Sequence, residues 1–297
     1  MASQATNMKT LLSAIKTKLL AYQGTTLSAI SGGWYRGVFV PKYGFPALAI
    51  MPVEEVISKY TSSFEYRVRR TVDIEVYSKQ PYAEDTVEQC MDLISAVKDI
   101  AQANIDWDDN AIDTTMPDET YRPVGEGIYA GILRMHILST ESRPSVIGSN
   151  SVVETDSKSM IQAIHTVFTN HIKGTSPSLS KINKIYRSYD TPPMKYPAIT
   201  LLEDNLIRDR KWAGQDHPTR NFRVKVQTYA LGREKNLDDN LDLVEIVKDI
   251  IQKNYKWGGK AYDSQIQGIS YDTVDMKDYP LYVSTIRFNV FGVEPLN

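Results

Sequence analysis

Two eleven-residue segments of this sequence match each other closely. Residues 97–107 read VKDIAQANIDW, and residues 247–257 read VKDIIQKNYKW. Seven residues recur in the same order, at a spacing of 150 positions. The match has two interpretations: a paired chemical motif, or a chain built twice from one plan. They lead to different functions, so the similarity has to be followed along the chain.

The similarity extends over most of both halves. YRGVFVPKYGFPALAI at 35–50 aligns without a gap on YRSYDTPPMKYPAITL at 186–201, and VDIEVY at 72–77 aligns on VKVQTY at 224–229. IYAGILRMHI at 128–137 aligns on LYVSTIRFNV at 281–290. Four ordered blocks at nearly one offset predict a tandem duplication. We therefore expect one domain at 1–143 and a second at 158–297, joined by a Ser-, Thr-, Pro- and Gly-rich linker at 144–157.

Each half predicts the order helix, strands, helix, strands. Apolar residues at helical spacing predict helices near 8–21 and 84–104, and near 158–173 and 237–254. Strands are expected near 34–40, 46–51, 66–78, 111–116 and 127–138 in the first half, and near 183–189, 197–202, 221–231, 265–274 and 280–292 in the second. This is an α+β fold: two tandem repeats of a small, mainly antiparallel sheet covered by two helices.

The two matching segments at 97–107 and 247–257 are then expected to form the end of each domain's second helix. Its buried stripes are expected at Val87, Met91, Ile94, Val97 and Ile100, and at Leu237, Leu241, Val244, Val247 and Ile250. The Lys-Asp pairs at 98–99 and 248–249 fall off these stripes and are expected to be solvated. Asn104 and Asn254 are predicted to end the helices in the left-handed conformation, and Trp107 and Trp257 to cover the core.

Chemical motifs are missing from both halves. The histidines lack partners at ligand spacing, DWDDN at 106–110 lacks the glycine and glutamate of a calcium loop, and Cys90 lies beside an apolar stripe. We therefore predict no enzyme and no catalytic, cofactor-binding or metal-binding residues. The single cysteine excludes an internal disulfide, and no apolar run approaches the roughly 20 residues of a membrane span.

Two sets of residues are candidates for an interface. Tyr35 with Arg36 and Tyr186 with Arg187 match between the halves, and contacts inside each domain are an equally good interpretation of them. The second set lies in a predicted loop at 203–221, which is longer than its counterpart at 52–65 and contains Arg208, Arg210, Lys211, Trp212 and Arg220. Trp and Arg are common binding hot spots. This favours a docking loop over a solvated hairpin.

The order of elements, with FPALAI and YPAITL, then LISAVKDI and LVEIVKDII, then ILRMHI and TIRFNVFG, resembles that of a known family. It is similar to the tail terminator (tail completion) proteins of long-tailed bacteriophages and to related neck proteins. The resemblance implies a structural protein that forms a ring, usually six-fold, on the last ring of the tail tube. It also implies that the ring stops tube growth and meets the head connector. Simple members of the family have one such domain, whereas this chain has two.

The partners implied are therefore further copies in a closed ring, the tail tube protein and the head connector or neck protein. A hexamer is favoured over a pseudo-hexameric trimer, with one domain copy lining the channel. DNA would only pass through the lumen, which suits a first half with 14 basic and 18 acidic residues. The expected location is the tail-neck region of a virion assembled in the host cytoplasm, without a membrane or cofactor. The alternatives are a neck or head-completion ring one level higher, or a tandem nucleic-acid-binding module, which the near-neutral charge disfavours.

Overall fold

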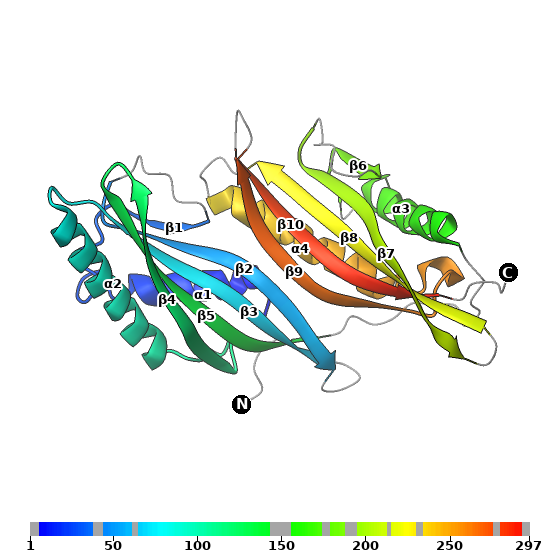
Figure 1. Cartoon of the computed structure of the whole chain (residues 1–297), viewed down its shortest axis with the longest axis horizontal. Coiled ribbons are helices and arrows are strands. Elements are labelled where there is room, and N and C mark those ends of the chain that lie inside the picture. The colour runs from blue at the N-terminus through cyan, green and yellow to red at the C-terminus, as the bar shows by residue number, and fades with distance from the viewer. Residues whose placement is uncertain are drawn as a thin grey trace. The chain divides into compact units, whose positions relative to one another are not determined.

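A computed structural model describes residues 6–37, 44–60, 65–142, 156–173, 179–187, 195–212, 215–229, 234–275 and 280–292. These residues form an α+β fold with four α-helices and mainly antiparallel strands (Figure 1). The chain divides into two compact units: Met1–Ser142 with Gly232–Asp238, and Arg143–Leu231 with Asp239–Asn297. The predicted linker at 144–157 lies outside the described residues except for its last two positions. Within the described part, no helix has the length and apolar character needed to cross a membrane.

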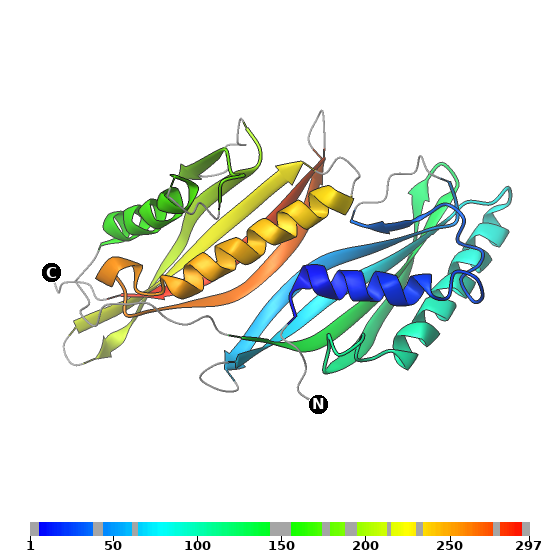
Figure 2. The same ribbon diagram turned by 180° about the vertical axis from the view of Figure 1, so that it is seen from behind.

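Unit 1 is built from helices and strands in alternating groups. Its elements are α1 (Met8–Leu20), β1 (Trp34–Arg36), β2 (Ala47–Tyr60), β3 (Glu65–Ser78), α2 (Ala83–Ala103), β4 (Asp113–Gly125) and β5 (Ile128–Ser142). The strand order β4-β5-β3-β2 is antiparallel throughout, and the short β1 pairs with β2 in parallel. Helix α1 lies across one face of these strands, as the blue helix in Figure 2 shows. Its residues Leu11, Leu12, Ile15 and Leu19, which recur at helical spacing, are fully buried.

Unit 2 has the same order of elements. They are α3 (Ser157–Lys173), β6 (Lys184–Arg187), β7 (Ala198–Trp212), β8 (Gln215–Tyr229), α4 (Glu234–Lys253), the 3₁₀ turn η2 (Trp257–Gly259), β9 (Asp263–Asp275) and β10 (Pro280–Phe291). The first residues of α4, up to Asp238, belong to unit 1. The order β9-β10-β8-β7 is antiparallel, and β6 pairs with β7 in parallel. Figure 2 shows α4 (gold) across one face of these strands.

The predicted loops at 52–65 and 203–221 are wrong, because strands occupy most of both segments. Strand β2 continues to Tyr60 and β3 begins at Glu65, while β7 continues to Trp212 and β8 begins at Gln215. Polar composition suggested loops, but strands tolerate polar residues that face cross-strand partners. Glu55, for example, lies opposite Arg70. In the second segment, β7 and β8 pair as a long antiparallel hairpin.

The predicted stripe is correct along α4 and only partly correct along α2. All five predicted residues of α4 are buried, whereas Met91 of α2 is 48% exposed. Cys90 is fully buried in its place. Opposite it stands Gly131, where an added Cβ would lie 3.0 Å from the Cys90 sulfur. The helix therefore approaches the sheet at position 90, which turns the neighbouring Met91 outward.

The residues after α2 and α4 form one hydrogen-bonding pattern in both units. The side-chain amides of Asn104 and Asn254 donate to the carbonyls of Ile100 and Ile250, at 2.8 and 2.9 Å. These bonds satisfy acceptors that a helix end leaves unpaired. The predicted left-handed conformation is wrong at Asn104, where φ is −130°. It occurs three residues later, at Trp107 (φ 45°) and Trp257 (φ 46°).

The two tryptophans cover the core, as predicted, and share one type of partner. Trp107 is fully buried, and its Nε1 donates to Thr114 Oγ1 at 3.0 Å. Trp257 is 1% exposed, and its Nε1 donates to Ser264 Oγ at 2.6 Å. Each hydroxyl donates in turn to a backbone carbonyl in the turn after the helix, at 2.7 Å for Thr114 and 2.8 Å for Ser264. The indole N–H is thereby satisfied without water.

The two Lys-Asp pairs of the repeated motif differ in exposure. Asp99 and Asp249 are exposed, as expected. Lys248 is only 2% exposed, so the prediction of a solvated pair is wrong at this position. Its Nζ lies 3.1 Å from Glu245 Oε1, one turn earlier on α4. A lysine is buried favourably when a carboxylate accompanies it.

Candidate interface surfaces

Tyr35 and Tyr186 pack within their own units. Tyr35 lies against a buried cluster that includes Ala47, Ala49 and Tyr77, and its hydroxyl donates to the Gly32 carbonyl at 2.8 Å. Tyr186 lies against the corresponding cluster in unit 2, made of Tyr196, Ala198, Leu281 and Val283. Both side chains are half-buried. These contacts place both tyrosines inside their own units, which is one of the two interpretations that the sequence left open.

Arg36 and Arg187 differ although their sequence positions match. The Arg36 side chain is 11% exposed, donates to Ser13 Oγ at 2.8 Å, and pairs at 2.9 Å with Asp238, which belongs to unit 1. Arg187 is exposed, and its Nη1 donates to Gln162 Oε1 on α3. Of the matched pairs, Arg187 is the residue best placed to meet a partner.

Arg220 is fully buried, so it does not fit an exposed docking residue. Its Nε donates to Ser157 Oγ at 3.2 Å and lies 4.0 Å from Glu203. Strand alternation explains the difference, because position 220 points toward the core side of β8, as Phe222 does. The side chains of Arg208, Arg210, Lys211 and Trp212 lie outside the described residues.

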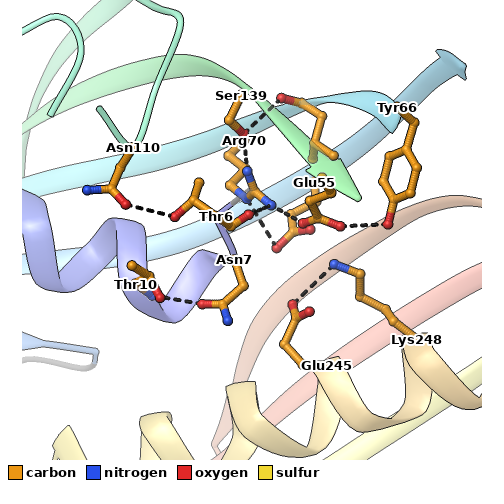
Figure 3. A network of polar contacts seen from close by, with 12 residues as sticks. Thr6, Asn7, Thr10, Glu55, Tyr66, Arg70, Asn110, Ser139, Glu245 and Lys248 are labelled. Carbon is orange, nitrogen blue, oxygen red and sulfur yellow. Dashed lines mark hydrogen bonds and ion pairs between the residues drawn. The ribbon is translucent and has the colours of Figure 1, made fainter. Parts of the chain in front are cut away.

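Unit 1 contains a buried arginine in the equivalent strand position. Arg70 is fully buried and is surrounded by polar groups (Figure 3). Its partners are the Thr6 carbonyl at 2.8 Å, Ser139 Oγ, Glu141 and, at 3.7 Å, Glu55. The Tyr66 hydroxyl also donates to Glu141, at 2.7 Å. The network joins β2, β3, β5 and the segment before α1.

The exposed Arg187 borders a groove of about 690 Å³ in unit 2. The groove runs along α3, past β6 and the turn at η2. Its charged lining residues are Asp156, Lys158, Arg187 and Lys260, and Ala163, Val167 and Trp257 give it an apolar floor. Three basic groups and one acidic group make the groove positive.

Hydrogen bonding holds the acidic group at one end of this groove. Asp156 Oδ1 accepts a hydrogen bond from the Ser159 N–H at 2.6 Å, which caps the N-terminus of α3. This bond holds the pKa of Asp156 below its usual value. Burial, followed by the Arg187 charge, lowers the pKa of His165 on the same helix. The carboxylate therefore stays ionised as a cap, and the histidine is held toward its neutral form.

Helix α2 of unit 1 carries the opposite charge. Its acidic residues are Glu84, Asp85, Glu88, Asp92 and Asp99, all exposed, and Lys98 is its one basic residue. Met91 is exposed among them, at 48%. Neither this acidic face nor the groove was among the surfaces expected from the sequence. The acidic face was visible as four carboxylates at 84, 85, 88 and 92, whereas the groove combines segments separated by up to about 100 residues.

Comparisons with known proteins give matches among solved structures. No protein-family model matches the chain, and no curated protein matches it. Among the 27 matching chains of solved structures is one described as "Virion of native gene transfer agent (GTA) particle". The match has 12% sequence identity and a TM-score of 0.30, and it covers 43% of this chain and 92% of that chain.

Proposed function

We propose that this chain is a structural virion protein of the tail terminator type. It forms a closed ring on the last ring of the tail tube and presents a surface to the head connector. The observation that carries the proposal is the correspondence between the two units, in sequence and in buried detail. It supports a tandem duplication of one small α+β domain, and a domain of that kind is what the resemblance to tail terminators implies.

The correspondence includes groups that have no common catalytic purpose. Arg70 and Arg220, Asn104 and Asn254, and Trp107 and Trp257 each recur at a spacing of 150. Arg70 lies opposite Ile137, and Arg220 lies opposite Val290, on the last strand of each unit. Since these are packing and capping groups, they support a repeated domain whose purpose is assembly.

The ring contact joins oppositely charged faces of neighbouring copies. The acidic face of α2 from one copy lies against the basic groove along α3 of the next, and Met91 enters beside Val167. Such a contact uses two different surfaces, so it can close into a ring by rotation. Complementary charge favours this pairing of faces over other contacts and speeds the association of the copies.

The assembly state tests the proposal. Mass photometry and cryo-EM of the purified chain are expected to show a ring of six copies. Arg187→Glu combined with Lys260→Glu should abolish the ring at low salt, and Glu84→Lys with Glu88→Lys should do the same. Mixing the two double variants should restore mixed rings. Lys79→Glu, a charge reversal at an exposed position outside both surfaces, is the control.

Two results would contradict the proposal at different levels. A chain that stays monomeric at assembly concentrations, with or without tail tube protein, overturns the ring. A ring of three copies overturns the hexamer and retains the ring. Labelling the chain in whole particles separates a terminator from a neck ring one level higher.

A further inference from the structure

A second hollow, of about 530 Å³, opens on unit 2. Its polar lining comes from four strands: Asp204 of β7, Asn221 and Arg223 of β8, Gln267 of β9, and Arg287 and Asn289 of β10. Strand alternation places these side chains on the face opposite the core, because Val224, Ile286 and Phe288 are buried on the side of α4. Figure 1 views this face of the strands, with α4 behind them.

Two arginine side chains lie side by side in this hollow. Arg223 and Arg287 are direct cross-strand partners on β8 and β10. Like charges in such positions are destabilising. Asp204 compensates one of them, since it accepts a hydrogen bond from Arg223 Nε at 2.5 Å. Over the part of the chain that the structure describes, Arg287 has no ion-pair or hydrogen-bond partner. The site therefore carries one uncompensated positive charge.

The equivalent place in unit 1 is closed by the chain itself. There Arg134 of β5 faces Asp73 of β3. The two form a bidentate pair, with Nε and Nη2 of Arg134 at 2.8 and 2.7 Å from the carboxylate oxygens. Unit 2 keeps the arginine as Arg287 and has Arg223 in place of the aspartate. Unit 2 therefore lacks a carboxylate at the position from which Asp73 pairs with the arginine in unit 1.

We propose that the hollow is a carboxylate-binding site in which Arg287 holds a carboxylate that this chain does not supply. The planar guanidinium matches a carboxylate with two parallel hydrogen bonds. Arg223, fixed by Asp204, provides the second positive charge, and the amides of Gln267 and Asn289 can donate at the rim. A single bound carboxylate neutralises the site. The proposal stands independently of the ring, because it concerns unit 2 alone.

Calorimetric titration of the full chain at constant ionic strength tests this site. The probes are glutarate and a capped peptide with a single glutamate, with chloride and a capped glutamine peptide as controls. Both carboxylates are expected to bind and to compete for one site. A tighter glutamate peptide identifies a protein side chain as the natural ligand, and equal affinities identify a free carboxylate.

Matched variants locate the binding. Arg287→Gln should weaken both probes at least about tenfold, the loss expected for a hydrogen-bonded charge. Arg134→Gln, at the equivalent place in unit 1, should leave the affinities unchanged. Arg223→Asp with Asp204→Asn should block binding while Arg287 remains, because it restores the pairing of unit 1. The proposal is overturned if Arg287→Gln binds as the natural chain does, if Arg134→Gln weakens binding equally, or if chloride competes at equal concentration.

Discussion

Single residues in this molecule carry buried charge, and Arg70 is the clearest case. It is fully enclosed and faces Glu55, itself fully buried, and Glu141, which is 8% exposed. Removing one member of such a cluster leaves the other charges buried without compensation, which costs about 3–5 kcal/mol. We expect Arg70→Met to lower the free energy of unfolding by this amount in urea denaturation.

Arg220 and Arg69 give the matched comparison for that prediction. The Glu203 carboxylate, 4.0 Å from Arg220, keeps a side-chain exposure of 22%, so it can be hydrated after Arg220→Met. The loss should therefore be smaller, about 1–3 kcal/mol. Arg69→Met alters an exposed neighbour of Arg70 and should change stability by less than about 0.5 kcal/mol. Equal losses for Arg69 and Arg70 would contradict the buried network.

The single thiol predicts a pH dependence. Burial raises the pKa of Cys90 from 9.0 to about 11. Because the folded pKa is the higher one, the protonated thiol favours the folded chain. This contribution is complete below pH 9 and is lost as the pH rises to about 11. At pH 8, Cys90 should resist a thiol reagent in the native chain and react at once in denaturant. Rapid reaction of the native chain would contradict its burial.

At the scale of elements, helices were easier to predict than their surroundings. Periodicity placed α1 and α3 within a residue or two, because a helix facing a core repeats its apolar residues every 3.6 positions. Strand β2 was too short in the prediction, since Glu55 looks like a loop residue until its pairing with Arg70 of β3 is known. The prediction that Met91 is buried was wrong because Gly131, which is distant in sequence, decides how closely α2 approaches the sheet.

Register was also hidden from the sequence. The alignment placed Val76 on Thr228, whereas hydrogen bonds match Val76 with Val226: their carbonyls accept from Cys90 and Asn240 respectively. A shift of two residues preserves the alternation of a strand, so hydrophobic pattern alone cannot detect it. The repeat of Asp113-Thr114 at Asp263-Ser264, at a spacing of 150, was a usable signal for the turn after the helix.

The hydrogen bonds of that turn lead us to expect similar losses of stability in two matched variants. Thr114→Val and Ser264→Ala each leave a buried indole N–H without its acceptor, at Trp107 and Trp257. An unsatisfied buried donor costs about 1–3 kcal/mol. We expect both variants to lose stability within this range in urea denaturation. Thr115→Val alters an exposed neighbour and serves as the control. A loss in one unit only would show that the two turns are not equivalent.

At the scale of the whole molecule, the sequence predicted a repeated domain, and its candidate interface residues met different outcomes. Tyr35, Arg36 and Tyr186 serve their own units, and Arg220 is buried. Among the candidates whose side chains the structure describes, Arg187 lies in an exposed groove. Residues that match between the two halves are those that both domains need, and such residues serve chiefly in packing. A surface specific to one unit, such as the Arg223–Arg287 pair, appears where the halves differ.

Two compact units also predict two unfolding transitions. Cys90 belongs to unit 1, so its reaction with a thiol reagent reports the opening of that unit. Arg70→Met should move this transition to lower urea concentration, because Arg70 lies in the same unit. Arg220→Met should leave it in place and shift a second transition, followed by Trp257 fluorescence in a chain whose other tryptophans are replaced by phenylalanine. Since each unit has its own core, its stability depends on its own contacts. If both variants move the thiol reaction equally, the chain unfolds as one cooperative body instead.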